Sequence, residues 1–153
     1  MKYLFLIFIS FTIIAACKPS VPSKEDTREM FDAGNLQVIS SFANRKAQTM
    51  SVLYGNQLAL QAALADYQTH QPGEQYTLVV YRQVGNKYWY GSYQNGKLLS
   101  AEHLKTISSP GGETLIQYNL AKGSPIKGKS GKVDTEQQRI EYIFSHRPSA
   151  FPN

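Results

Sequence analysis

The stretch Tyr76-Thr-Leu-Val-Val-Tyr-Arg-Gln-Val84 decides the fold, because β-branched and aromatic residues fill most of it. A run of this composition predicts a strand in the middle of a sheet. Pro72-Gly73 lies just before it and turns the chain into the strand. The segments on both sides should therefore supply its neighbours in that sheet.

Turn signals after this strand predict a meander of hairpins. Gly85-Asn86 suits a first tight turn, and Asn95-Gly96 is the strongest two-residue hairpin signal because both positions tolerate a positive φ. Pro110-Gly111-Gly112 predicts a third turn. The strands expected around these turns and before the central strand are residues 47–54, 87–93, 98–108 and 113–121.

Two helices are expected before the central strand. A short one at residues 25–32 would end at Gly34-Asn35, where the left-handed conformation can cap it. Asn56 is placed to cap a second helix that runs to Gln68. The buried face of this second helix is expected to consist of Leu60, Ala63, Leu64 and Tyr67.

A last helix is expected near the C-terminus. Asp134 would accept from its first turn, Gln137 would complete a capping box, and Pro148 would stop it. The residues on its apolar face are Ile140, Ile143 and Phe144. The expected order of elements is a helix, then successive antiparallel strands, then a helix. This order predicts an α+β domain in which helices pack on one face of an antiparallel meander.

The N-terminus predicts export and membrane attachment. Residues 3–14 are apolar, which suits a signal peptide and is too short to span a bilayer. Ala15-Ala16-Cys17 follows and resembles the lipobox of bacterial lipoproteins. The resemblance implies that residues 1–16 are a signal peptide, that cleavage separates Ala16 from Cys17, and that Cys17 carries acyl chains as a membrane anchor. The alternative is an unmodified thiol behind an ordinary signal peptide or transmembrane anchor.

Cys17 is the only cysteine among 153 residues, which excludes a disulfide framework and a cysteine metal site. Lys18 follows it, and in Gram-negative lipoproteins an aspartate at that position retains the protein in the inner membrane. By that resemblance, Lys18 implies the outer membrane, facing the periplasm. Residues 17–28 have the composition of a flexible tether, which leaves residues 29–153 as a single domain.

The net charge of +5 is mild and dispersed, unlike the clustered basic stripe of a nucleic-acid-binding protein. The segment Gly123-Ser-Pro-Ile-Lys-Gly-Lys-Ser130 matches the phosphate-binding loop pattern. Gly131-Lys132 separates it from the last helix, and hairpins rather than crossovers join the strands before it. We therefore predict a solvated loop that binds no nucleotide. The lysines that could instead touch lipid phosphates are Lys122, Lys127, Lys129 and Lys132.

Aromatic residues on adjacent strands are candidates for a ligand pocket. Because side chains alternate along a strand, Tyr88 and Tyr90 would share one face, while Trp89 and Tyr93 would share the other. One set would pack under the helices and the other would line a cleft; the alternative is that both only pack. The candidate pocket residues are Tyr81, Trp89, Tyr90 and Tyr118.

Catalytic patterns are absent from the sequence. His70, His103 and His146 lack the short spacing of a zinc site, and no catalytic serine motif or paired-carboxylate pattern occurs. We therefore expect no catalytic and no metal-ligating residues.

Three motifs resemble the cytochrome P-four-sixty family of exported bacterial c-type haem proteins. They are Met50-Ser-Val-Leu-Tyr-Gly-Asn-Gln57, Pro72-Gly73 before the hydrophobic strand, and Tyr88-Trp-Tyr-Gly91. The resemblance covers residues 47–148 and implies an antiparallel sheet with flanking helices and a pocket beside the sheet. Some members of that family oxidise hydroxylamine or bind nitric oxide.

The haem-attachment segment of that family is Cys-x-x-Cys-His near the C-terminus. This chain has Tyr142-Ile-Phe-Ser-His146 at the corresponding place, so covalent attachment is excluded for lack of thiols. His146 is retained where the axial ligand would be, and it is the candidate ligand of a non-covalent haem.

Three functions remain open at this point. The preferred one is a non-catalytic lipoprotein module that binds a small molecule or a protein partner, with no cofactor. The second is a haem- or gas-binding protein that uses His146. The third is an enzyme with a site around Tyr81, Arg82 and Trp89.

Overall fold

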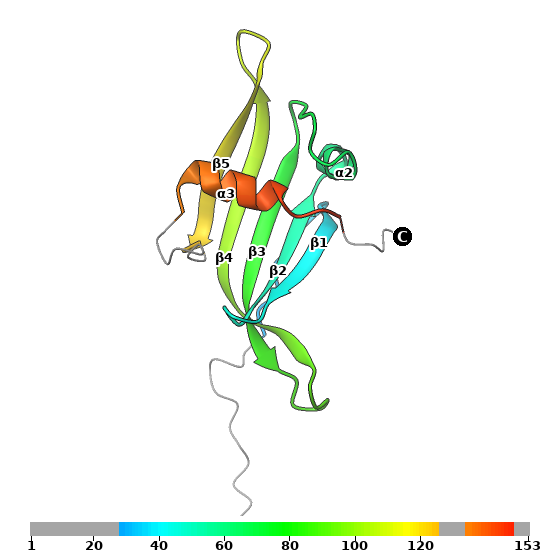
Figure 1. Cartoon of the computed structure of the whole chain (residues 1–153), viewed down its shortest axis with the longest axis vertical. Coiled ribbons are helices and arrows are strands. Elements are labelled where there is room, and N and C mark those ends of the chain that lie inside the picture. Colours follow the sequence, from blue (N-terminus) through cyan, green and yellow to red (C-terminus); the bar gives the residue numbers. More distant parts are fainter. Residues whose placement is uncertain (1–27, 126–133, 149–153) are drawn as a thin grey trace, which may run out of the picture.

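The computed structural model of the chain describes residues 28–125 and 134–148. Five strands form one antiparallel sheet in the order β1-β2-β3-β4-β5, so each strand pairs with its neighbours in sequence (Figure 1). Helix α2, Gln57–Leu64, connects β2 to β3, and helix α3, Glu136–Phe144, follows β5. The strands are β1 Gln37–Asn44, β2 Thr49–Gly55, β3 Gln75–Gly85, β4 Tyr93–Ser108 and β5 Thr114–Gly123.

The expected α+β class is wrong. The two helices are short and make up 15% of the described chain, so the domain is closer to an all-β meander. Residues 28–32, where the first helix was expected to end, are not helical. The helix after Asn56 ends at Leu64 rather than Gln68, because Asp66 and Tyr67 both take a φ of 55° and break the helical path.

The hairpin predicted at Asn95-Gly96 is also wrong, because β4 runs through this dipeptide. The real turn is the loop of residues 86–92, in which Asn86 N–H donates to the Ser92 carbonyl oxygen at 2.9 Å. Asn86 Oδ1 accepts from Tyr88 N–H at 2.9 Å and starts this loop. At Gly96, a Cβ atom would lie 2.8 Å from Val84 Cγ1, so this glycine allows close packing rather than a turn.

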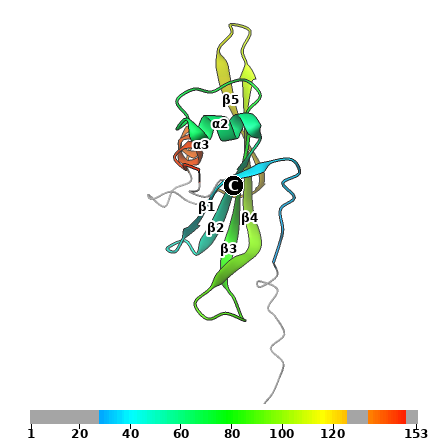
Figure 2. The same cartoon turned by 90° about the vertical axis from the view of Figure 1, so that its right-hand side faces the viewer.

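The main core lies between one face of the sheet and both helices, which pack on the same side (Figure 2). Asn56 caps α2 as expected, accepting from Ala59 N–H at 3.0 Å. The buried face of α2 is formed by Ala59, Ala62 and Ala63, whereas Leu64 is 60% exposed. The core residues are Ile39, Leu53, Ala59, Ala63, Tyr76, Leu78, Val80, Leu104, Ile140 and Ile143.

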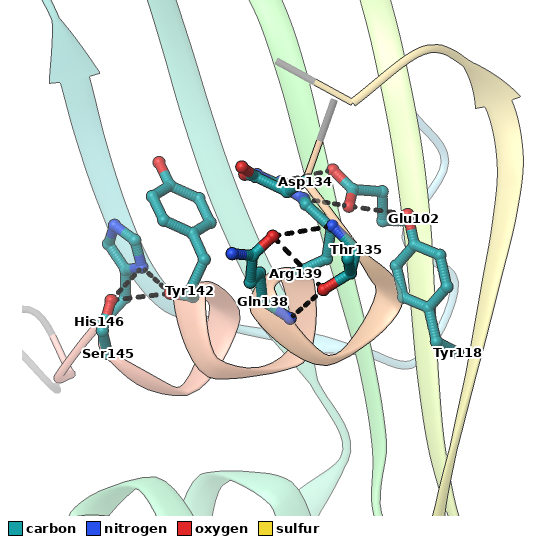
Figure 3. Close-up of polar contacts among 9 residues, drawn as sticks. All are labelled: Glu102, Tyr118, Asp134, Thr135, Gln138, Arg139, Tyr142, Ser145 and His146. Atoms are coloured by element: carbon teal, nitrogen blue, oxygen red, sulfur yellow. Dashed lines mark hydrogen bonds and ion pairs between the residues drawn. The ribbon is translucent and has the colours of Figure 1, made fainter. Parts of the chain in front are cut away.

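A buried ion pair holds α3 on this face (Figure 3). Arg139 on α3 donates through Nε and Nη2 to the two carboxylate oxygens of Glu102 on β4, at 2.9 and 2.7 Å. Tyr118 on β5 donates to the same carboxylate at 3.0 Å. Burial alone would lower the pKa of Arg139, but the hydrogen bonds and charge of Glu102 outweigh it and raise that pKa.

The N-cap of α3 is Thr135, one residue later than expected. Its hydroxyl accepts from Gln138 N–H at 3.3 Å, and the Gln138 side chain accepts from Thr135 N–H at 2.9 Å, which completes a capping box. Asp134 is left to face Arg139, with Nη1 and Oδ2 3.4 Å apart.

The N-terminal segment of the described chain, residues 28–36, crosses the other face of the sheet, called here the outer face (Figure 2). Phe31 N–H donates to the Tyr81 hydroxyl at 3.1 Å. The rings of Phe31 and Tyr54 also pack together, with centroids 5.7 Å apart. A second, smaller apolar cluster around Val79, Tyr81 and Leu98 lies under this segment.

Candidate ligand-binding site

A cleft of 780 Å³ opens beside the outer face, at the β3–β4–β5 side of the N-terminal segment. Its volume lies within the range of roughly 300 to 1,000 Å³ that is typical of small-molecule sites. Residues 31–36 supply one wall, and side chains of the three strands supply the floor. At the β5 edge, Glu136 from the first turn of α3 closes the lining.

The wall presents the apolar side chains of Phe31 and Leu36 together with the carboxylate of Asp32. Asp32 Oδ1 accepts from Gly34 N–H at 2.9 Å, and Leu36 N–H donates to the Ala33 carbonyl oxygen at 3.0 Å. Gly34 takes a φ of 54°, which glycine adopts without strain. This turn bends the segment back over the sheet and holds both apolar side chains at the cleft.

The floor consists of two polar rows that follow the strand register. Thr77 on β3 pairs with His103 on β4, which pairs with Asn119 on β5. The second row contains Gln75, Lys105 and Gln117, in the same strand order. Side chains two residues apart on a strand share a face, so both rows lie side by side on the outer face.

The electrostatics of the floor are set by His103 and Lys105. Thr77 Oγ1 and His103 Nδ1 are 2.8 Å apart and share a hydrogen bond. Burial, followed by the nearby Lys105 charge, lowers the pKa of His103 from its ordinary value of 6.5. The imidazole is therefore neutral at pH 7, and Lys105 is the cation of the floor.

The four pocket residues expected from the sequence do not come together in this cleft. Tyr118 lines it, but its hydroxyl is bonded to Glu102, and burial together with that carboxylate raises its pKa to about 12. Tyr81 is buried below the N-terminal segment and holds it by the bond to Phe31. Trp89 and Tyr90 lie on the exposed loop between β3 and β4.

His146 lies at the end of α3 and is not among the residues that line the cleft. Its Nδ1 is 2.8 Å from the Tyr142 carbonyl oxygen, so Nδ1 carries the hydrogen and Nε2 keeps a lone pair. The Phe42 ring stacks on the imidazole with centroids 3.8 Å apart. Burial lowers the pKa of His146, as expected for a neutral packed imidazole.

The enzyme site considered around Tyr81, Arg82 and Trp89 is not assembled. Tyr81 and Arg82 are consecutive on β3, so their side chains lie on opposite faces of the sheet, and Arg82 is exposed. Within residues 28–125 and 134–148, no group of histidine, aspartate and glutamate side chains could hold a metal ion.

Sequence reasoning missed the polar floor. Its signal was the polar alternation at positions 75 and 77, 103 and 105, and 117 and 119, all of which lie on the predicted strands except position 75, which directly precedes one. Alternation alone marks a solvent-facing side, and only the register shows that the three pairs meet.

Several expectations lie outside the described residues. They include the cleavage point at Ala16 and Cys17, the lysines at positions 127, 129 and 132, and all of the phosphate-loop match beyond Pro125. The described part of the chain has no helix long and apolar enough to cross a membrane. No family model and no curated protein matches this sequence.

Proposed function

We propose that this chain is a bacterial lipoprotein, anchored through Cys17 to the outer membrane and facing the periplasm, whose domain binds a small molecule without transforming it. The observation that carries the ligand-binding part is the cleft, which has Phe31 and Leu36 in its wall and a polar floor. The cysteine and its preceding small residues support the anchor.

The lining favours an amphipathic ligand. An apolar body would pack against Phe31 and Leu36, where it is removed from water. Its polar end would face the Thr77–His103 pair and the ammonium group of Lys105, which attracts an anionic group such as a carboxylate. The other charged groups of the lining are the carboxylates of Asp32 in the wall and Glu136 at the β5 edge. Lys105 lies between Gln75 and Gln117 in its row, whose amides can add hydrogen bonds.

The same lining argues for binding without catalysis. His103 is bonded to Thr77, and among the described lining residues no carboxylate holds its imidazole as in a nucleophilic triad. The carboxylate of Asp32 already accepts from Gly34 N–H.

The proposal can be tested by calorimetric titration of the purified protein. The panel of ligands consists of small amphipathic carboxylates, matched amides and matched amines. Carboxylates should bind most tightly, and Lys105→Ala should weaken their binding while leaving matched amides unaffected. Lys46→Ala serves as the charge-matched control, because Lys46 is an exposed lysine on the turn between β1 and β2. A panel without any binder, or equal affinities for Lys105→Ala and the parent, would count against a ligand site in this cleft.

A second candidate function, non-covalent haem binding, is favoured by the free Nε2 lone pair of His146. The relationship of this chain to the cytochrome P-four-sixty family stays a prediction. Haemin added to the protein should then give a shifted Soret band that is lost in His146→Ala and kept in His103→Ala. An unshifted spectrum of the parent protein would remove this candidate.

A further inference from the structure

The loop between β3 and β4 presents consecutive aromatic side chains to solvent. Tyr88 is 78% exposed, Trp89 is 73% exposed, and Tyr90 next to them is fully exposed. We call these three residues the aromatic tip. The loop projects from one end of the molecule, and the turn between β4 and β5 lies at the opposite end (Figure 1). Tyrosine and tryptophan are enriched where proteins meet the headgroup region of a membrane.

The described chain begins at the same end of the molecule. Glu29 N–H donates to the carbonyl oxygen of Gly96, which lies three residues into β4 from Tyr93 at the base of the loop. Arg28 lies 11 residues after Cys17 in the sequence. Such a segment can span at most about 40 Å when fully extended. An anchor at Cys17 therefore ties this end of the molecule close to the membrane.

Exposed basic residues surround the base of the aromatic tip. The turn between β1 and β2 reaches this end, because Thr49 pairs with Arg82 and Gln83 N–H donates to the Gln48 carbonyl oxygen at 2.8 Å. Among the described residues at this end, the acidic side chain of Glu29 is paired with Lys122 at 3.4 Å. We call the exposed basic residues the basic collar: Arg28, Arg45, Lys46, Arg82, Lys87 and Lys97.

Lys87 links the two features, since its ammonium group lies 4.9 Å from the centre of the Tyr88 ring. Basic side chains near a membrane surface are attracted to anionic headgroups, while aromatic rings occupy the region just below them. In this protein the aromatic side chains project beyond the basic ones. This order matches a membrane, in which the anionic headgroups lie outside the region that aromatic side chains prefer.

We propose that the aromatic tip enters the headgroup region of the membrane and that the basic collar rests on anionic lipid headgroups. This inference rests on the proposed attachment through Cys17. The lipid surface would then orient the domain with the β4–β5 turn pointing away from the membrane.

Trp89 is the only tryptophan of the chain, so its fluorescence reports on the tip alone. The mature chain that begins at Cys17 can be coupled through this single thiol to a maleimide lipid in vesicles of phosphatidylethanolamine and phosphatidylglycerol. Trp89 emission should shift to shorter wavelength on coupling, and vesicles with brominated acyl chains should quench it. The proposal would be overturned if Trp89 emission stayed unchanged on coupling and only a water-soluble quencher reduced it. That result is also the one expected if the aromatic tip binds a protein partner instead of lipid.

Two variants serve as controls. Trp89→Phe with Gly111→Trp moves the reporter to the β4–β5 turn, where a side chain at Gly111 meets open space, and brominated lipid should then have no effect. Arg45→Glu with Lys46→Glu should lower the quenching of Trp89 in anionic vesicles and leave it unchanged in phosphatidylcholine vesicles. Equal quenching of tip and turn reporters would also overturn the proposed orientation.

The chemical coupling separates this inference from the proposed function. An unmodified Cys17 thiol found by mass spectrometry of the protein from bacterial membranes would overturn the natural anchor. It would leave the vesicle result, and therefore the affinity of the tip for lipid, unaltered. Absence of ligand binding in the cleft would likewise leave Trp89 quenching as expected.

Discussion

Glu102 helps to hold α3 on the sheet, together with the core contacts of Ile140 and Ile143. Its side chain has no exposed surface, and Arg139, only 3% exposed, is its partner from the last helix. A buried ion pair adds little net stability over apolar residues of the same shape, but removal of one partner leaves a buried charge unpaired. The pair therefore specifies where α3 docks more than how stable the domain is.

Arg139→Met should lower the free energy of unfolding by about 3 to 5 kcal/mol, because Glu102 would keep only the hydrogen bond from Tyr118. Urea unfolding followed by circular dichroism measures this loss. The double variant Glu102→Leu with Arg139→Met should recover most of it. A single variant as stable as the parent would show that Glu102 tolerates its isolation.

His103 and His146 predict a loss of stability in mild acid. Burial lowers the pKa of both below the ordinary value of 6.5, so the unfolded chain takes up protons that the folded chain resists. The free energy of unfolding should thus fall as pH drops below about 6.5, towards the lowered folded-state values. Urea unfolding at about pH 7.5 and about pH 5.5 measures it. His103→Gln with His146→Gln should flatten this dependence, and an unchanged slope would contradict the assignment.

At the scale of elements, Asn56 ties helix α2 to the sheet. Its Oδ1 accepts from Ala59 N–H at 3.0 Å and from Gln75 N–H at 3.2 Å, and its Nδ2 donates to the Gly73 carbonyl oxygen at 2.8 Å. One side chain therefore caps the helix and fixes the start of β3.

Asn56→Ala should cost about 1 to 2 kcal/mol of unfolding free energy, since both the cap and the bonds to β3 are lost. Asn56→Asp keeps the acceptor but not the donor, and it should fall between the parent and the alanine variant. Chemical denaturation of the three proteins gives the ranking. Equal stabilities of Asn56→Asp and Asn56→Ala would show that the cap contributes nothing.

Elements with strong local signals were predictable from the sequence. Residues 76–81 of β3 are all buried, as their run of β-branched, leucine and aromatic side chains indicates. The cap at Asn56 is a local interaction. The strand β1 was missed because it is an edge strand in which only Ile39 and Ser40 are buried, so little hydrophobic alternation remains. Asn95-Gly96 misled because packing against Val84, not turn formation, accounts for Gly96.

The cleft could not be predicted, because it is formed by parts of the chain that are far apart in the sequence. Its wall comes from residues 31–36 and its floor from three strands, and no sequence pattern shows that these parts meet. Each polar row joins residues that are far apart along the chain, as Thr77 and His103 are. Such sites depend on strand register, which is a property of the whole sheet.

At the scale of the whole molecule, the cleft depends on a contact outside its floor. The N-terminal segment, residues 28–36, forms its wall, and the hydrogen bond between Phe31 and Tyr81 holds this segment on the sheet. Tyr81→Phe removes the hydroxyl that accepts from Phe31 N–H, while its ring can still pack in the small outer cluster. Ligand affinity should fall several-fold with little change in the unfolding midpoint. Hydrogen exchange at the Phe31 amide should become faster, and slow exchange in the variant would show that other contacts hold the segment.

The sequential strand order has a consequence for biogenesis. Local pairings of this kind form quickly, because each requires only a short stretch of chain to close. The sheet can therefore assemble in the order in which the chain emerges during synthesis or during the export proposed above. Its apolar face would stay open until Ile140 and Ile143 arrive with Arg139. A product interrupted before α3 would carry an exposed apolar surface and the unpaired carboxylate of Glu102, and both features would distinguish it from a finished molecule.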